Sequence, residues 1–327
     1  MTGDVPALAF CTIADAAYFP GVVALVNSLR LQGHHEPLTI LDLGLTAPQR
    51  DQLRGTCEFV TPAQPRHPWL LAPHALLAAR ADVSVYLDAD VLVTAPLHDV
   101  LDDARAGKLC AFPDSLADRW FAEWEQRFDL PDAPRRQPYR NAGFVALAPA
   151  AFPGLLERWA ELCDRLAGAR FDELAVDYTS PTGLPDQDAF NALLMTEVHP
   201  EQLASSDPAR ISQGNGELAA TRVVDPRAVV CERDGRRVLL LHSFSAPKPW
   251  EPSARRYLPD TAYLRCLRRL LVGPDLAVRT GASASDGPGA PSAAWLAPGL
   301  RGALALRMLT TRTALRPRTR WRAWRAC

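Results

Sequence analysis

The sequence predicts an α/β fold built around a mostly parallel sheet, followed by a linker and a tail, and three observations support this organisation. Short apolar runs alternate with helix-like segments over the first 110 residues, the pattern of β-α-β units. The 327 residues are 48% apolar and 22% charged, enough for a substantial core. At residue 280 the composition turns to Gly, Ala, Ser and Pro, which marks a linker. We therefore expect a folded domain at 1–275, a linker at 276–295 and a basic, tryptophan-containing tail at 296–327.

The expected elements follow one another along the chain. Pro20 suits the first turn of a helix that ends near Gly33, and Thr46 suits the cap of the next helix. Apolar runs mark the strands, and Asp234-Gly235 marks a hairpin turn. In order, we expect strand 7–13, helix 20–33, strand 38–45, helix 46–55, strand 57–60, partial helix 70–80, strand 83–90, strand 141–148, helix 150–168, helix 186–197 and hairpin 229–244. Residues 208–226 carry no motif that we can interpret.

The seven cysteines are scattered and never form a C-x-x-C pair, so neither a disulfide framework nor a zinc site is expected. A reduced, cytoplasmic setting fits them best. The N-terminal segment has no basic region, so no signal peptide is expected. No apolar stretch reaches the roughly 18 residues that a membrane span needs.

The C-terminal tail differs in charge from the rest of the chain. Residues 301–327 carry eight arginines and no acid, so the net charge of −1 leaves −9 on residues 1–300. Leucines and Met308 recur at helical spacing, followed by Trp321 and Trp324. This pattern is typical of an interfacial anchor on anionic lipid, which would place the tail at the inner face of the membrane. The alternatives are a solvated tail or a non-specific contact with nucleic acid, and no specific nucleic-acid partner is expected.

The stretch VYLDADVLV, residues 85–93, ends an apolar strand on two acids. Ligands of parallel α/β sheets bind at the carboxyl ends of the strands. Residues i and i+2 of an extended chain point the same way, so Asp88 and Asp90 could reach one cation. Hard oxygen ligands suit magnesium or manganese, which substrate phosphates often share. The alternative is a pair of solvated turn acids.

A second apolar run, in LLLHSFSAPKPW (239–250), places His242 at a strand end, with Lys248 six residues later. A neutral imidazole could complete a carboxylate metal site, and the lysine could neutralise a diphosphate. The alternative for His242 is a hydrogen-bonded core histidine.

Four segments together resemble the retaining glycosyltransferases of family 8, the group that includes glycogenin and bacterial lipooligosaccharide galactosyltransferases. They are TIADAAYFPGVVALVNSL, VYLDADVLV, YRNAGFVAL with PDQDAFNALL, and HSFSAPKPW, in the family's order. The resemblance implies a GT-A fold, a Rossmann-like α/β fold with a mixed central sheet. It also implies a UDP-sugar donor, a hydroxyl acceptor that the sequence does not identify, and a Mn²⁺ (or Mg²⁺) ion.

The resemblance further implies a role for each matching residue. The metal would be held by Asp88, Asp90 and His242, and the β-phosphate would meet Lys248. The base pocket would be lined by Ala14, Asp15 and Tyr18, the last stacked on the uracil. The donor sugar would face Asp114, Asn141, Ala142 and Gly143, together with the catalytic candidates Asp186, Gln187 and Asp188.

Elementary chemistry is compatible with these roles. A leaving diphosphate needs its growing charge stabilised, and an oxocarbenium-like carbon needs polar groups to orient the ring. Gly143 would allow close approach of a ligand, although a plain turn into a strand remains the alternative. Asp186 could equally be an acid favoured by a helix N-terminus. Gln187 is a poor nucleophile, so we expect a front-face displacement that retains the anomeric configuration.

Three features depart from the family pattern. Ser245 replaces a glycine, and its Cβ could crowd the diphosphate. The family usually has a basic residue before the paired acids that reaches the donor. In this sequence that segment offers only His74 until Arg80. Residues 119–140 are rich in aromatics, prolines and arginines, which favours either a surface helix with a loop or a lid over the acceptor.

Two other functions compete with glycosyl transfer. A sugar nucleotidyltransferase would need a basic, glycine-rich loop after the first strand, and TIADAAYFPG has no basic residue. A catalytically decayed protein that binds sugar nucleotides or carbohydrates is the second alternative, and Ser245 favours it.

Overall fold

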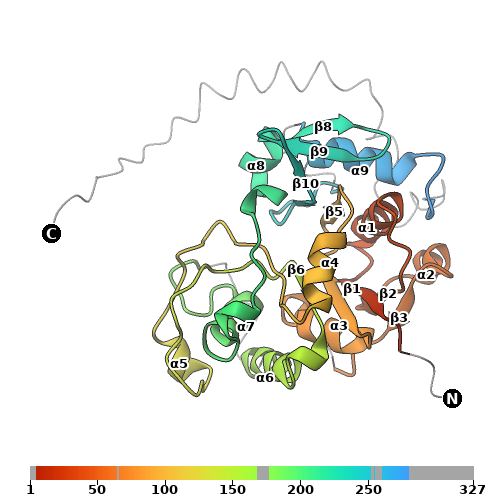
Figure 1. The fold of residues 1–327 in the computed structure, drawn as a ribbon. Coiled ribbons are helices and arrows are strands. Elements are labelled where there is room, and N and C mark those ends of the chain that lie inside the picture. The colour runs from red at the N-terminus through yellow and green to blue at the C-terminus, as the bar shows by residue number, and fades with distance from the viewer. Residues whose placement is uncertain (1–4, 65, 168–176, 252–253, 255–259, 280–327) are drawn as a thin grey trace.

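The computed structural model describes residues 5–64, 66–167, 177–251, 254 and 260–279. Its central sheet has the strand order β3-β2-β1-β4-β6 (Figure 1). The strands are β1 (Leu8–Ala14), β2 (Leu38–Asp42), β3 (Glu58–Val60), β4 (Val83–Leu87) and β6 (Phe144–Leu147). The first four are parallel and β6 is antiparallel to β4, so the predicted mixed sheet is confirmed.

Helices cover both faces of this sheet, because successive strand residues point to opposite sides. In β1, Leu8 and Phe10 belong to one apolar core, whereas Ala9 and Cys11 belong to the other. The first core is closed by α1 (Phe19–Leu31), α4 (His98–Arg105) and α9 (Ala262–Val272). The second is closed by α3 (Ala72–Ala79), α6 (Leu155–Ala167) and α7 (Pro185–Thr196).

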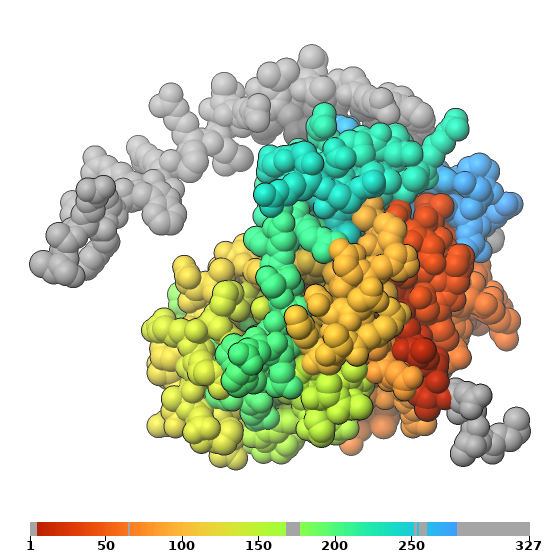
Figure 2. Space-filling view, in the orientation of Figure 1, coloured from red at the N-terminus to blue at the C-terminus, as the bar shows by residue number. Residues whose placement is uncertain are grey.

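Two smaller sheets lie beside the central one. In the first, β11 (Leu240–His242) runs antiparallel to β5 (Val91–Val93) and parallel to β7 (Ile211–Gln213). The second has the order β10-β9-β8, from β8 (Arg222–Asp225), β9 (Val230–Arg233) and β10 (Arg236–Val238). The turn predicted at Asp234-Gly235 joins β9 to β10, and both turn residues have positive φ. Figure 2 shows the region of β8, β9, β10 and α9, in cyan to blue, grouped at the end of the molecule next to α1.

The remaining elements are short. Thr46 caps α2 (Ala47–Leu53) through a capping box, as its position predicts. In the described ranges, the other helices are α5 (Trp124–Arg127) and α8 (Gly214–Ala220), and the 3-10 helices are η1 (Pro68–Leu70), η2 (Pro149–Ala151), η4 (Pro200–Gln202) and η5 (Pro208–Arg210). Residues 208–226, which had no interpretable motif, therefore hold η5, β7, α8 and all of β8.

The strand before the paired acids is shorter than predicted. β4 ends at Leu87, and Asp88 to Asp90 form a tight turn in which Val91 N donates to Asp88 O at 3.0 Å. The chain then enters β5, which pairs with β11 instead of continuing the central sheet. The two carboxylates are thus brought together by a turn, not by strand alternation.

The C-terminal region packs on α1 up to residue 279. Val278 is buried, and its N–H donates to Asn27 Oδ1 at 2.9 Å. The rest of the expected linker, 280–295, and the tail, 296–327, lie outside the described residues. Among the helices of the described ranges, none is long and apolar enough to cross a membrane.

Candidate functional site

A cavity of about 560 Å³ opens where the ends of β1, β4 and β11 meet the first turn of α7. It is the kind of site expected at the carboxyl ends of parallel strands. The predicted site residues that line it are Ala14, Asp15, Tyr18, Asp88, Asp90, Asp114, Asn141, Ala142, Gly143, Asp186, Gln187, His242 and Lys248. Asp188 and Ser245 are the two predicted residues that do not line it.

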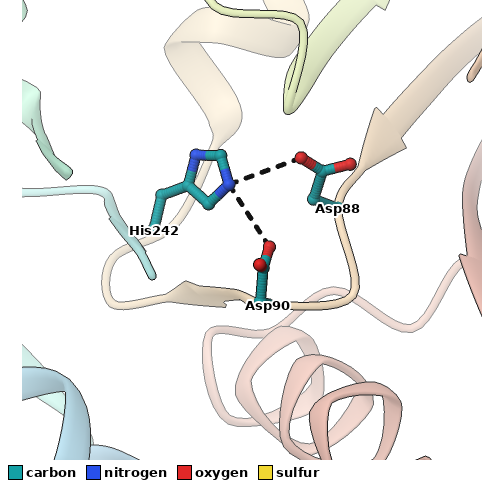
Figure 3. Close-up of side chains that lie close together, drawn as sticks. All are labelled: Asp88, Asp90 and His242. Atoms are coloured by element: carbon teal, nitrogen blue, oxygen red, sulfur yellow. Dashed lines mark ion pairs between the residues drawn. The ribbon is translucent and has the colours of Figure 1, made fainter. Parts of the chain in front are cut away.

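Asp88, Asp90 and His242 converge on one point of the cavity (Figure 3). His242 Nε2 lies 3.3 Å from Asp88 Oδ2 and 3.2 Å from Asp90 Oδ1. The pairing of β11 with β5 produces this contact, because it sets His242 opposite Val91, directly after the acids. One donor atom from each side chain lies within 4.8 Å of the others, which suits a single cation.

The burial and charge of these groups fit a divalent ion. Asp90 Oδ1 and both ring nitrogens of His242 are buried without a hydrogen bond to any described residue. Burial alone favours the neutral imidazole, but the charges of Asp90 and Asp88 raise the pKa of His242 to about 9. Burial alone would raise the pKa of Asp90, yet Lys248 and His242 lower it to about 2. A divalent cation would replace the proton that the imidazole now carries.

Gly143 leaves the space that this cluster occupies. A Cβ at residue 143 would lie 2.5 Å from His242 Cε1 and 2.6 Å from Asp88 Oδ2. Neither neighbour can retreat freely, since both are fixed by the cluster. The glycine of the NAG motif is therefore required by the close packing of His242 and Asp88, a reason that sequence reasoning did not give, and the close approach of a ligand stays a prediction.

Sequence reasoning missed Tyr86 as a partner of the cluster. Its hydroxyl donates to Asp88 Oδ1 at 2.6 Å and it also lines the cavity. The hydrogen bond orients the more exposed of the two carboxylates, since 37% of the Asp88 side-chain surface is accessible against 6% for Asp90. The spacing of residues 86 and 88 in the quoted motif was the signal that could have found it.

The segment after β11 holds the other side of the cluster in place. Lys248 Nζ contacts Asp90 Oδ2 and also donates to the carbonyls of Ser243 and Phe244. Trp250 Nε1 donates to Ala17 O at 2.9 Å, and its ring meets Tyr18 edge-on. The K-P-W motif thus links the acids to the loop after β1. Ser245 is half-buried and lies outside the cavity lining.

A polar network links Asp114, Asn141 and Gln187. Asp114 Oδ2 accepts from Asn141 Nδ2 at 2.9 Å and from Gln187 Nε2 at 3.3 Å. The Gln187 carboxamide is also held from its other end, where Oε1 accepts from the Ala142 N–H at 2.9 Å. These contacts fix the orientation of the amide at the cavity wall.

The two aspartates that flank Gln187 have different surroundings. Asp186 faces the cavity, and burial together with the charge of Asp88 raises its pKa to about 8. Asp188 is fully buried and forms a bidentate ion pair with Arg119, with N–O distances of 2.6 and 2.7 Å. It also accepts from the hydroxyl of Tyr139 at 2.7 Å. These contacts direct the Asp188 carboxylate into the protein, away from the cavity.

The expected acceptor lid at residues 119–140 is not found at the cavity, because no residue of that range lines it. The expected surface helix is only the four-residue α5, and the rings of Trp124, Phe128 and Tyr139 are buried in the core instead. The exposed aromatic side chains at the cavity are Trp69, Tyr178 and Phe244, none of which the sequence motifs singled out.

Comparison with known proteins gives matches in structure alone. No family model and no curated protein matches the sequence. The galactosyltransferase LgtC, solved with donor and acceptor sugar analogues, is similar at 20% identity and a TM-score of 0.50, over 82% of this chain and 98% of that one. The bifunctional glycosyltransferase WbbM is similar at 13% identity and a TM-score of 0.50, over 83% of this chain and 50% of that one. GlyE from Streptococcus pneumoniae is similar at 16% identity and the same TM-score, over 76% and 57%.

The chain has a GT-A glycosyltransferase fold. The predicted resemblance is thereby confirmed at the level of the fold. In this GT-A chain, the acidic pair Asp88 and Asp90 stands where the central sheet meets the cavity, as a D-x-D motif does.

Proposed function

We propose that this protein is a retaining glycosyltransferase that moves a sugar from a UDP-sugar to an acceptor hydroxyl. The convergence of Asp88, Asp90 and His242 in the cavity carries the proposal. LgtC, which shares the fold, was solved with donor and acceptor sugar analogues, and we extend that pair of ligand classes to this chain.

The three converging side chains would hold a divalent cation, Mn²⁺ or Mg²⁺. Such an ion would neutralise the negative charge that grows on the leaving diphosphate. Lys248 would add a second positive charge for the same diphosphate. Its ammonium now neutralises Asp90, and it would turn to the β-phosphate once a cation takes over that charge.

The remaining lining residues suit a nucleotide and a sugar. Asp15 and Tyr18, with Ala14, lie beside the end of β1, where Trp250 supports the Tyr18 ring for stacking on the base. Asp114 and Asn141 present polar atoms for sugar hydroxyls, beside Ala142 and Gly143, whose small size lets the ring approach.

The surroundings of the acids favour a front-face displacement. Asp188 is neutralised by Arg119 and buried, and Asp186 is mostly protonated at pH 7, so neither is a ready nucleophile. The acceptor oxygen would attack the anomeric carbon from the side that the diphosphate leaves. The anomeric C–O bond breaks, the new C–O bond forms, and the hydroxyl proton passes to the departing phosphate oxygen.

A catalytically decayed sugar-nucleotide or carbohydrate-binding protein is the second candidate. The observation that favours it is the tight bonding of Lys248 Nζ to Asp90 and two carbonyls, which leaves the ammonium no free proton for a phosphate.

Hydrolysis of donors separates the two candidates. We expect manganese-dependent release of UDP from one of UDP-glucose, UDP-galactose or their N-acetyl forms, and loss of release in Asp90→Ala. Asp132→Ala, which removes an exposed carboxylate outside the cavity, is the matched control. UDP binding by calorimetry without hydrolysis of any donor would favour the decayed protein, and absence of both would refute the transferase.

The domain boundary and the tail also enter the proposal. We propose that residues 1–275 are the catalytic domain of a cytoplasmic protein and that 296–327 contact anionic lipid. Deleting 296–327 should preserve donor hydrolysis and lower co-sedimentation with anionic vesicles. Unchanged co-sedimentation would argue against the anchor.

A further inference from the structure

The exposed aromatic side chains of the described residues gather at the cavity. Trp69 is 42% exposed, Tyr178 57% and Phe244 44%, and all three line the cavity. The other large apolar side chains that are equally exposed in the described ranges are valines, and none of them lines it. Exposed aromatic rings cost free energy unless a ligand covers them, so their concentration at one opening indicates a binding surface.

These rings are held in place by the protein. Trp69 belongs to η1, which packs against α6 and α7, and its ring meets the His67 ring edge-on. The carbonyl of Tyr178 accepts from Arg119 Nη1 at 2.6 Å, which anchors its loop to the buried Asp188 pair. The Phe244 ring meets His242 edge-on, with 5.7 Å between ring centroids. Trp69 and Tyr178 thus belong to the α7 side of the cavity, and Phe244 to the metal side.

The charge of the lining limits which ligand these rings can take. The chain has 34 arginines, yet none of those in the described ranges lines the cavity. Among the described residues, Lys248 is the one lysine in the lining, and its ammonium is bonded to Asp90. Five aspartates line the same cavity, and Asp186 is mostly protonated at pH 7. An anionic acceptor would meet repulsion from the others, with no arginine or free lysine among the described lining residues to pair with it.

We propose that Trp69 and Tyr178 form a stacking platform for an uncharged saccharide, which is the acceptor of the transfer proposed above. The C–H faces of a pyranose ring are apolar and cover an aromatic ring well, while its hydroxyls remain free for polar groups such as Ser115, which also lines the cavity. The identification of this saccharide as the acceptor rests on the proposed function; the platform itself rests on the rings and the charge of the lining.

An oligosaccharide array tests the platform directly. The full chain, with Mn²⁺ and UDP, is applied to an array of neutral oligosaccharides and their uronic-acid and sialylated counterparts. We expect binding to neutral members and little to acidic ones. The best neutral member is then titrated by calorimetry. In Trp69→Ala and Tyr178→Ala, the fold-loss of affinity for this saccharide should exceed the fold-loss of affinity for UDP by about tenfold.

Conservative and distant substitutions complete the test. Trp69→Phe and Tyr178→Phe keep a ring and should retain most of the saccharide affinity, whereas Val224→Ala, exposed and away from the cavity, should change nothing. Three outcomes would overturn the platform. They are a preference for acidic oligosaccharides, no bound saccharide in a chain that binds UDP, and a saccharide affinity of the alanine variants equal to that of the wild-type chain. Ring-dependent saccharide binding in a chain that does not bind UDP would support the platform and refute the transferase instead.

Discussion

The two sides of the cavity are built in opposite ways. On the metal side, three charged groups face one another across a turn and a strand end, and almost none of their surface is exposed. They are Asp90, His242 and Lys248. On the α7 side, the two aspartates of α7 are already neutralised, Asp188 by Arg119 and Asp186 by its proton, and the exposed apolar surface is aromatic. The metal side therefore offers charge to a ligand, whereas the α7 side offers shape and apolar surface.

The largest expected effect concerns the ion pair behind the α7 side. Arg119→Met would leave the Asp188 carboxylate buried without its partner and free the carbonyls of Tyr178 and Ser180. We expect a loss of about 3–5 kcal/mol in the free energy of unfolding, measured in urea. Arg105→Met, which breaks an exposed arginine–aspartate pair with Asp102, should change it by less than about 1 kcal/mol. Equal losses in both variants would mean that the α7 side does not depend on this pair.

The next effect is on the metal side. Gly143→Ala would push a methyl group into His242 and Asp88, so the donor atoms could no longer share one cation. We expect affinity for Mn²⁺ to fall by about tenfold to a hundredfold, measured by calorimetry. The control is Gly216→Ala, because a Cβ at residue 216 meets no atom within 4 Å. An unchanged Mn²⁺ affinity in Gly143→Ala would remove the cluster from consideration as a metal site.

The smallest effect concerns the proton on Asp186. Its pKa in the folded protein, about 8, lies above the unfolded value of about 3.9. The folded state therefore binds the extra proton between these values, and this contribution to stability is complete below pH about 4 and is lost as the pH rises to about 8. In metal-free buffer, the wild-type chain should lose on the order of 2 kcal/mol more than Asp186→Asn between pH 5 and pH 6.5.

Urea unfolding at several pH values measures this difference, with Asp132→Asn as the exposed control. Parallel pH profiles for the wild-type chain and Asp186→Asn would show that Asp186 is ionised in the folded protein. The contrast with the metal side, where acids are held charged, would then disappear.

Sequence reasoning was most successful where a charged residue ends an apolar run. Such a position is costly for a buried strand, so Asp88, Asp90 and His242 were visible as exceptions, and the structure brings all three together. The alternation of apolar residues likewise predicted the central strands, since each face of the sheet is buried.

Features that depend on distant partners could not be predicted. Arg119 and Asp188 are 69 positions apart, and either residue alone reads as a surface charge. Trp69 and Tyr178 belong to short irregular segments without periodicity, where an aromatic residue is usually assigned to the core. The turn at Asp88 to Asp90 was only the alternative to a strand end, because the apolar residues of β5 continue the pattern of β4, although β5 joins a different sheet.

The register of β11 against β5 has a consequence for the stability of the whole chain. Because His242 is contributed by a strand some 150 positions after the acids, any ion held by all three donors would join the N-terminal half to the segment that contains β7, β11 and α9. The free energy of binding this ion would then stabilise the contact between the two segments. This stabilisation would grow with the logarithm of the ion concentration. Chelation would then loosen the docking of the C-terminal strands, and protease cleavage around them would report how much of the ion is bound.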